Sequence, residues 1–381
     1  MTVPAVSTVP LGPARPDRPL LVLGPSLGTS AEGLWGTAAA SLAEEFDVLG
    51  WDLPGHGTGP PPDGPFTMAE LAAGVLAAVE EHLAARATFR YAGDSVGGAV
   101  GLQLLLDAPD RIAAATLLCT GARIGTAESW TERIAAVRAG GTKAMVEGSA
   151  ARWFAPGFAD REPARAARLL DELPSIDDDG YVAVCGALAT FDVRERLAGI
   201  TAPVLAVAGA VDVSTPPDAL RAIAEAVPGA RLVVLDGVAH LAPAEVPGTV
   251  ARLVATHPVP DPHADGMAVR RAVLGDAHVD RAVAATTDLT RDFQDFLTRY
   301  AWGEIWTRPG LDRRSRSMIT LAALVALGHD DELAMHLRAA RRNGLTDAEI
   351  GEVLLHAAIY CGLPAANGAF RIAQEVLAEE R

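Results

Sequence analysis

The feature that most constrains the fold of this chain is the pentapeptide Gly-Asp-Ser-Val-Gly at residues 93–97. A short apolar run precedes it, and a helix-like segment at residues 98–108 follows it. In a strand, turn and helix of this kind, small residues let the chain turn sharply enough to expose the serine hydroxyl. Ser95 is therefore the first candidate for a nucleophile. The pentapeptide alone also fits a plain turn, so its possible partners decide between the two interpretations.

Short apolar runs alternate with helix-like segments on both sides of this turn. The runs lie at residues 20–23, 46–51, 89–92, 112–119, 204–208 and 232–235. Continuous apolar runs are typical of strands buried on both faces, and their alternation with helices indicates a doubly wound, mostly parallel sheet. Residues 127–197 interrupt the alternation with helical segments that contain tryptophan and no strand. We interpret them as a lid over the carboxyl edge of the sheet.

Two polar residues that could act with the serine follow strands beyond the lid. Asp212 and His240 each come just after one of the last two runs. Side chains at the carboxyl ends of parallel strands meet at one edge of the sheet, where His240 would take the proton of Ser95 and Asp212 would orient the imidazole. Alone, Asp212 could cap a helix and His240 could be a loop histidine. Together with the serine they predict a catalytic triad, with the backbone N–H groups of Leu27 and Val96 as oxyanion-hole donors.

Composition excludes several classes of partner. The formal net charge is -16, and binding to polyphosphate or anionic lipid needs a basic face, so we expect neither nucleic acid nor membrane as a partner. No apolar run approaches the roughly 20 residues that cross a bilayer, and the first residues do not read as a leader peptide, so we expect a cytoplasmic protein. The three cysteines are far apart and form no C-x-x-C pair. They indicate no disulfide framework and no metal site.

A proline-rich stretch at residues 259–265 separates two parts of the chain. It lacks apolar periodicity, which is typical of linkers, so we expect one domain at residues 1–258 and a second at 266–381. The second domain has apolar residues at three and four spacing throughout, which predicts an all-α bundle. Its expected helices are residues 280–301, 313–327, 331–342, 346–361 and 364–380. Such bundles often bury an apolar face by self-association, so we expect a homo-oligomer through this domain.

The second domain also has candidate polar residues. Glu352 and His356 are four residues apart and share one helix face, and His336 lies in a mainly apolar helix. Arg308 and Arg313 belong to an arginine cluster that could hold carboxylates, because guanidinium groups bind them at two points. For each residue alone, packing or a solvated face remains the simpler interpretation.

Several motifs of the first domain occur together in one known family. They are Pro-Ser-Leu-Gly-Thr at 25–29 with Trp35, Pro-Gly-His-Gly at 54–57, the serine pentapeptide, residues 122–130, and Arg-Trp-Phe at 152–154. Residues 18–258 resemble the 3-oxoadipate enol-lactonase branch of the α/β-hydrolases. The resemblance implies an α/β-hydrolase fold with a helical lid and hydrolysis of a lactone carboxylate by Ser95. Arg123, Trp130 and Trp153 are then candidate contacts to the substrate. The short N-terminus leaves little room for the leading hairpin usual in the family.

The second domain carries motifs of another family at residues 302–314, 320–324, 336–340 and 349–360. From residue 266 onward the chain resembles 4-carboxymuconolactone decarboxylase, an all-α protein. The same superfamily includes disulfide reductases that need a C-x-x-C pair. Cys361 has no such partner, which argues against that activity here. The two resemblances together imply a bifunctional enzyme of protocatechuate breakdown in the β-ketoadipate pathway. Its second domain would make 3-oxoadipate enol-lactone, and its first would hydrolyse that lactone to 3-oxoadipate.

The decarboxylation that this resemblance implies suits the candidate residues. Electrons left by carbon dioxide delocalise through the ring alkene into the lactone carbonyl, so the reaction requires no cofactor. His336 and His356 are candidates for the acid and the enolate donor with Glu352 orienting them, and Arg308 and Arg313 for holding the carboxylates. Two alternatives remain open. The hydrolase could serve another ester or lactone, and the helical domain could be a non-catalytic oligomerisation module.

Overall fold

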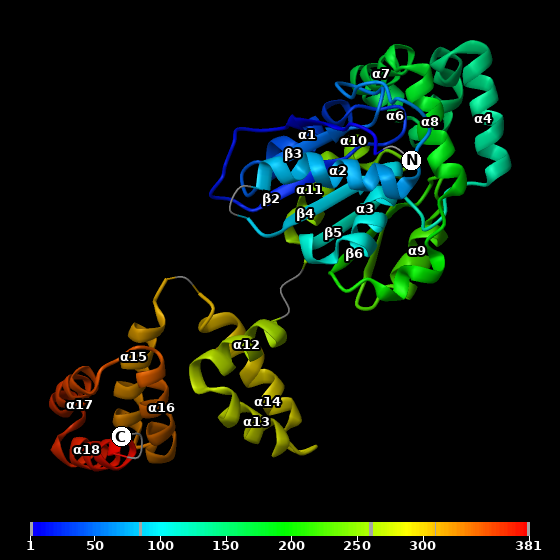
Figure 1. Ribbon diagram of the computed structural model, residues 1–381. Helices are drawn as coiled ribbons and strands as arrows, with labels where there is room; N and C mark the ends of the chain where they lie inside the picture. Colours follow the sequence, from blue (N-terminus) through cyan, green and yellow to red (C-terminus); the bar gives the residue numbers. More distant parts are fainter. Residues whose placement is uncertain (1–2, 84–85, 259–261, 309, 379–381) are drawn as a thin grey trace. The chain divides into compact units, whose positions relative to one another are not determined.

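The computed structural model describes residues 3–83, 86–258, 262–308 and 310–378. Its elements form two compact units, Met1–Pro258 and Val259–Arg381 (Figure 1). Of the expected linker, residues 259–261 lie outside the described residues, and residues 262–265 form the start of helix α12 (Pro262–Leu274). The prediction of a linker up to residue 265 is therefore wrong at that end. Pro262 fits the first turn of a helix, where its missing N–H group needs no partner.

A seven-stranded sheet in the order β1-β3-β2-β4-β5-β6-β7 forms the centre of the first unit. The strands are β1 (Ser7–Pro10), β2 (Leu20–Gly24), β3 (Asp47–Asp52), β4 (Phe89–Asp94), β5 (Ile112–Leu118), β6 (Val204–Gly209) and β7 (Arg231–Leu235). β1 pairs with β3 in antiparallel orientation, and all other neighbouring pairs are parallel. The expected mostly parallel sheet is confirmed. The N-terminus adds the single strand β1, which the sequence pattern does not indicate.

Helices cover both faces of this sheet (Figure 1). They are α1 (Ala31–Leu42), α2 (Met68–Leu83), α3 (Val96–Asp107), α9 (Pro217–Ala226), α10 (Ala242–Glu245) and α11 (Pro247–Thr256), with the 3-10 turn η1 (Pro109–Arg111). β3 lies on one side of β2 and β4 on the other. Because crossovers between parallel strands are right-handed, α1 lies on one face and α2 on the opposite face. The strand order thus reverses between β2 and β4, which is where open α/β sheets bind ligands.

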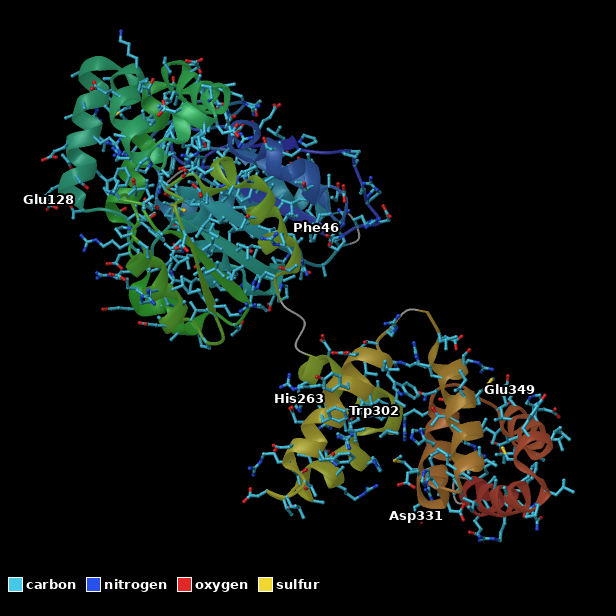
Figure 2. The ribbon with its side chains drawn as sticks, turned by 180° about the vertical axis from the view of Figure 1, so that it is seen from behind. Phe46, Glu128, His263, Trp302, Asp331 and Glu349 are labelled. Atoms are coloured by element: carbon cyan, nitrogen blue, oxygen red, sulfur yellow. The ribbon has the colours of Figure 1, made fainter. Side chains whose placement is uncertain are left out.

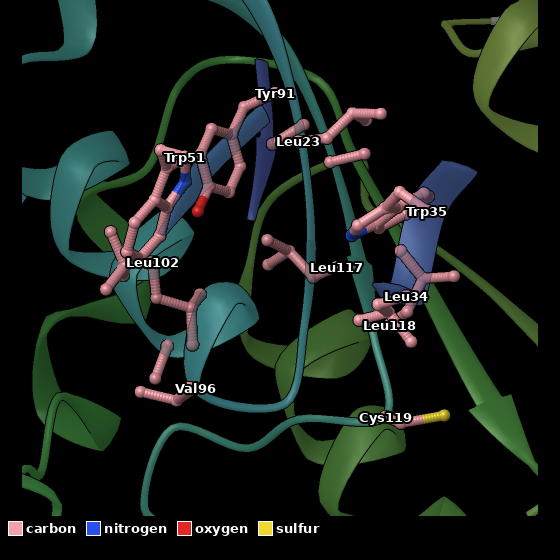
Figure 3. Close-up of a cluster of buried hydrophobic side chains, with 14 of the residues drawn as sticks. Leu23, Leu34, Trp35, Trp51, Tyr91, Val96, Leu102, Leu117, Leu118 and Cys119 are labelled. Atoms are coloured by element: carbon pink, nitrogen blue, oxygen red, sulfur yellow. The ribbon is translucent and has the colours of Figure 1, made fainter. Parts of the chain in front are cut away.

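The core of the first unit fixes the ends of these two strands (Figure 3). Trp35 and Tyr91 are fully or almost fully buried, like their neighbours Leu23 and Trp51. The indole N–H of Trp35 donates to the carbonyl of Gly24 at 2.8 Å, and the Tyr91 hydroxyl donates to the carbonyl of Gly97 at 2.7 Å. The apolar core therefore holds both the loop after β2 and the turn after β4.

Residues 127–197 contain helices and no strand, as the sequence pattern predicts. They are α4 (Ala127–Gly140), η2 (Thr142–Met145), α5 (Val146–Trp153), α6 (Phe158–Arg161), α7 (Pro163–Glu172), η3 (Leu173–Ser175), α8 (Asp178–Thr190) and η4 (Arg194–Gly199). α4 packs against α8, and Thr126 begins α4 with a capping box that includes Ser129. The backbone carbonyl of Trp153 accepts hydrogen bonds from the N–H groups of His240 and Leu241 at 3.2 and 3.1 Å. The lid is thus tied to the loop that carries the histidine.

The second unit is helical over its described residues (Figures 1 and 2). Its elements are α12, α13 (Asp276–Ala284), α14 (Arg291–Phe296), the π-helix η5 (Leu297–Ile305), α15 (Arg313–Leu327), α16 (Asp330–Arg342), α17 (Asp347–Cys361) and α18 (Leu363–Ala378). One apolar cluster joins α15 to α18, and a second joins α12, α13, η5 and α16 around Trp302. Residues 379 and 380 of the last expected helix lie outside the described residues. No helix in the described part of the chain is long and apolar enough to cross a membrane.

The expected single helix at residues 280–301 is wrong. Helix α13 ends at Ala284, and α14 begins at Arg291. Between them the Thr286 hydroxyl donates to the carbonyl of Ala282 at 3.1 Å, and the N–H of Thr287 donates to the hydroxyl of Thr290 at 2.9 Å. Threonine side chains that bond to nearby backbone compete with the helical pattern, and here they end one helix before the next begins.

Candidate active sites

Ser95 lies in the sharp turn between β4 and α3. Its φ is 53°, in the left-handed region that residues other than glycine rarely adopt. A Cβ atom on Gly93 would lie 2.3 Å from the carbonyl oxygen of Gly97, and one on Gly97 would lie 2.6 Å from that of Pro25. The two glycines of the pentapeptide are therefore required by close backbone approach, and they allow the serine side chain to project from the sheet edge.

The three residues of the predicted triad lie in hydrogen-bond contact, although they come from three separate loops. The hydroxyl oxygen of Ser95 is 2.9 Å from Nε2 of His240, and Nδ1 of His240 is 2.8 Å from Oδ2 of Asp212. All three side chains are buried. Their order and roles match a nucleophile, a base and an orienting acid. The geometry supports proton transfer from Ser95 to His240.

Asp212 is held in its charged form. Burial alone would raise its pKa, but hydrogen bonds from His240 and Thr215 and the charge of the imidazole bring the pKa of Asp212 below its usual value. Its Oδ1 accepts from the N–H groups of Ser214 and Thr215 at 2.7 and 3.1 Å, and its Oδ2 accepts from the Thr215 hydroxyl at 2.7 Å. A carboxylate with this many donors remains ionised and fixes the imidazole tautomer.

The predicted oxyanion-hole donors lie at the reversal of strand order. Gly24 at the end of β2 is paired in register with Gly93 near the end of β4. Leu27 and Val96 follow these two strands, and neither of their N–H groups donates a hydrogen bond within the described residues. Two free backbone donors from adjacent loops are the arrangement that stabilises the oxyanion of a tetrahedral intermediate.

A cavity of about 190 Å³ opens at the triad. Ser95 and His240 contribute to its lining from the loops after the strands, and residues of the lid contribute the rest of the charged and aromatic lining. The lining residues are Ser26, Leu27, Ser95, Ile124, Gly125, Ser129, Trp130, Arg133, Arg152, Trp153, Ser214 and His240. The site therefore combines a nucleophile with a mixed aromatic and cationic wall.

Two arginines that sequence reasoning missed supply the charge of this cavity. Arg133 and Arg152 are both half-buried, and the guanidinium of Arg133 lies 5.0 Å from the ring centre of Trp130. Burial lowers the pKa of Arg152, and the positive charge of Arg133 lowers it further. Within the described residues neither forms an ion pair with an acid. Two adjacent unpaired cations facing a cavity favour an anionic ligand such as a carboxylate.

Of the other predicted substrate contacts in the first domain, Trp130 and Trp153 line the cavity and Arg123 does not. Trp130 and Trp153 are buried and line the cavity, and the indole N–H of Trp130 donates to the carbonyl of Ile124 at 2.6 Å. Arg123 is exposed and does not line the cavity, so its predicted contact with the substrate has no support in this geometry. The sequence does contain a pattern that could have identified Arg133. It follows Trp130 by three residues, so the two side chains share one face of α4.

A buried acid next to the nucleophile plays no part in the triad. Asp94 is fully buried, and neither its carboxyl oxygens nor the hydroxyl of Ser26 has a well-aligned hydrogen-bond partner in the described residues. Burial raises the pKa of Asp94 well above its usual value, the charges of Asp212 and Glu245 raise it further, and Ser26 offsets a part. Burial therefore favours the uncharged form of the Asp94 carboxyl.

The candidate residues of the second unit do not form one cluster. His336 is half-buried on α16, and burial, together with the nearby His278, lowers its pKa to about 4. Glu352 and His356 lie exposed on α17, where the ring of His356 is 5.2 Å from that of Tyr360. No hydrogen bond or ring contact joins His336 to either of them within the described residues. The histidine that acts on the pKa of His336 is His278, which sequence reasoning did not single out.

The two predicted arginines of the second unit also lie on the surface. Arg308 and Arg313 are exposed, and the carbonyl of Arg308 accepts a hydrogen bond from Arg316 at 2.9 Å. This contact closes the loop before α15. Among the described residues, no group of three or more histidine, cysteine, aspartate or glutamate side chains is placed to hold a metal ion.

Comparison with known proteins agrees with this division of the chain. The α/β hydrolase fold model matches residues 19–247, and the carboxymuconolactone decarboxylase family model matches residues 291–375. The 3-oxoadipate enol-lactonase 2 of Acinetobacter baylyi is 34% identical over 231 residues, which are 61% of this chain and 85% of that protein. The 4-carboxymuconolactone decarboxylase of the same organism is 52% identical over 111 residues, which are 29% of this chain and 83% of that protein.

A solved structure gives the same result for the first unit. The enol-lactonase from Burkholderia xenovorans LB400 has a TM-score of 0.62 and 32% identity, and the match covers 66% of this chain and 95% of that chain. The predicted fold classes and the predicted fusion are therefore confirmed. The chain belongs to the α/β-hydrolase fold family through its first unit and to the carboxymuconolactone decarboxylase family through its second.

Proposed function

We propose that this chain catalyses two consecutive reactions of protocatechuate breakdown. Its second unit decarboxylates 4-carboxymuconolactone to 3-oxoadipate enol-lactone, and its first unit hydrolyses that lactone to 3-oxoadipate. The names of the two relatives support this pairing, because the product of the one reaction is the substrate of the other. The observation that carries the proposal is the pair Arg133 and Arg152 in the triad cavity, since a plain esterase of neutral substrates has no need of two unpaired cations.

In the first unit, Ser95 attacks the lactone carbonyl while His240 accepts its proton. The N–H groups of Val96 and Leu27 stabilise the oxyanion of the tetrahedral intermediate. Collapse breaks the ring C–O bond and expels an enolate, which leaves readily because protonation converts it into a ketone. A water molecule activated by His240 then hydrolyses the acyl-serine ester. Throughout these steps the free carboxylate of the substrate binds Arg133 and Arg152.

In the second unit, the bond between the ring and the carboxylate breaks, and carbon dioxide leaves. The electron pair delocalises through the alkene into the lactone carbonyl, and protonation at carbon gives the enol-lactone. A hydrogen-bond donor at the carbonyl and a neutral acid are the groups that this reaction needs. Among the predicted residues His336 suits the role of the carbonyl donor best, because it is half-buried and its pKa of about 4 leaves a neutral imidazole that donates a hydrogen bond without giving up its proton.

Supplying 4-carboxymuconolactone to the purified full chain tests the proposal. We expect equal amounts of carbon dioxide, measured as released gas, and of 3-oxoadipate, measured by chromatography. A panel of simple neutral esters serves as the comparison and should react poorly. Rapid hydrolysis of these esters without reaction of the lactones would instead identify a hydrolase of other specificity. Lactone hydrolysis without decarboxylation would leave the helical unit as an oligomerisation module.

A further inference from the structure

A basic pocket lies in the second unit between the start of α13 and one face of α16. Its volume is about 690 Å³. Met335, Arg338 and Arg342 line it from α16, where their spacing of three and four residues places them on one helix face. His278 and Arg281 line it from α13. None of the predicted substrate contacts lies in this pocket.

The positive charge of this pocket is not neutralised by its own acids. Arg271 forms ion pairs with Asp276 at 3.2 Å and Asp280 at 2.7 Å, which accounts for both acids at the start of α13. Within the described residues, Arg281 and Arg342 form no ion pair. A cationic pocket on a chain with a net charge of -16 is not a general property of its surface. It indicates a local preference for an anion.

The start of α13 adds to this preference. Gly275 precedes the helix with φ 88° and offers no side chain to cap the first N–H groups. A Cβ atom at Gly275 would lie 2.8 Å from Cζ of Arg342, so the guanidinium lies directly against the helix start. The N-terminus of a helix carries a partial positive charge and free N–H donors. The first turn of α13 has its own acid, Asp276, but this carboxylate is paired with Arg271, so the guanidinium of Arg342 adds positive charge to the helix start that is not matched there.

Two histidines accompany the arginines. Burial lowers the pKa of His278, and the charges of Arg281, Arg270 and Arg342 lower it further. His336 lies on α16 outside the lining of the pocket, where burial and the nearby His278 lower its pKa and Glu332 acts in the opposite direction. Both imidazoles are therefore neutral at pH 7 and able to donate one hydrogen bond each.

We propose that this pocket binds a small polycarboxylate, with Arg281, Arg342 and the start of α13 as the carboxylate-binding groups and His278 as a neutral hydrogen-bond donor. Separate guanidinium groups around a volume of this size suit carboxylates at different ends of one small molecule. A lactone dicarboxylate belongs to this class, so we assign the pocket to the substrate of the decarboxylation. This assignment rests on the proposed function of the second unit.

Binding of tricarballylate, an unreactive tricarboxylate, to the full chain tests the site without turnover. We expect calorimetry to detect binding to the wild type, at least tenfold weaker binding to Arg281→Gln and Arg342→Gln, and no change for Arg371→Gln. Arg371 is the matched control because it lies exposed in the same unit, paired with Glu375 on α18. NMR titration should also show the pKa of His278 rising when the anion binds. No binding, or equal binding by Arg342→Gln and Arg371→Gln, would overturn the site.

Decarboxylation kinetics test the assignment to the substrate separately. Tricarballylate should raise the KM for carboxymuconolactone without lowering kcat, and Arg342→Gln should raise that KM at least tenfold while leaving lactone hydrolysis unchanged. Decarboxylation that tricarballylate does not inhibit, despite binding, would show that the substrate uses another site. Binding of tricarballylate by a chain that performs no decarboxylation would support the anion site and refute the proposed function of the second unit.

Discussion

Replacing Arg152 by glutamine tests how the triad cavity selects its substrate. Arg152 and Arg133 lie together in the cavity wall without an acidic partner in the described residues. A hydrogen bond to a charged group contributes about 1.5–3 kcal/mol. Since about 1.4 kcal/mol corresponds to a tenfold change in rate, loss of one guanidinium should lower kcat/KM for the enol-lactone by about tenfold to about a hundredfold. We expect a loss in kcat/KM nearer to tenfold, because Arg152 is only half-buried and Arg133 remains to bind the carboxylate.

The assay compares the enol-lactone with its neutral methyl ester. Arg152→Gln should lower kcat/KM for the anion and leave the ester almost unchanged, because the ester lacks the charge that Arg152 binds. The melting temperature should not fall, since the substitution removes a repulsion with Arg133. Arg138→Gln, an exposed change on the neighbouring lid helix α4, is the matched control. Equal losses for both substrates, or none for either, would refute the role of the arginine pair in carboxylate binding.

Three further predictions concern other parts of the chain. Asp212→Asn should lower kcat for lactone hydrolysis by about four orders of magnitude through the wrong imidazole tautomer, and leave decarboxylation unchanged in a parallel assay. Asp94→Asn should retain lactone hydrolysis, and in thermal melts it should stabilise the chain at pH 7 but not at pH 4. Because the pKa of Asp94 is raised in the folded state, its neutral carboxyl contributes fully to stability only below the unfolded-state pKa of about 4. That contribution is lost as the pH rises, whereas the asparagine side chain stays neutral and loses nothing. Ile359→Asp should shift light-scattering mass toward the monomer, because Leu355, Ile359 and Tyr360 are 56%, 78% and 78% exposed on α17; an unchanged mass would remove α17 from the expected interface.

The fold of the first unit could be predicted because its signals are local. Continuous apolar runs mark the buried strands, and the glycines around Ser95 are required by contacts of 2.3 and 2.6 Å. Asp212 and His240 could be found because both follow strands whose carboxyl ends share one edge. The strand β1 could not, because its four residues are half-buried or exposed, half of them are polar, and they form no continuous apolar run.

The walls of the two pockets depend on tertiary packing that no local pattern reports. Arg133 and Arg152 come from two lid helices, and only the placement of the lid brings them to the triad. His278 affects the pKa of His336 because α13 and α16 contribute to one apolar cluster. The expected helix at residues 280–301 began after His278 and did not include the break before Arg291. In both cases residue type indicated the chemistry, but the partners became visible only in three dimensions.

The central claim, two independent reactions in one chain, is tested most directly by the variant Ser95→Ala supplied with 4-carboxymuconolactone. Carbon dioxide should be released at the wild-type rate, while 3-oxoadipate formation falls to the uncatalysed level and the enol-lactone accumulates. Loss of carbon dioxide release would contradict the independence of the two sites. Continued rapid formation of 3-oxoadipate would contradict the role of Ser95 as the nucleophile.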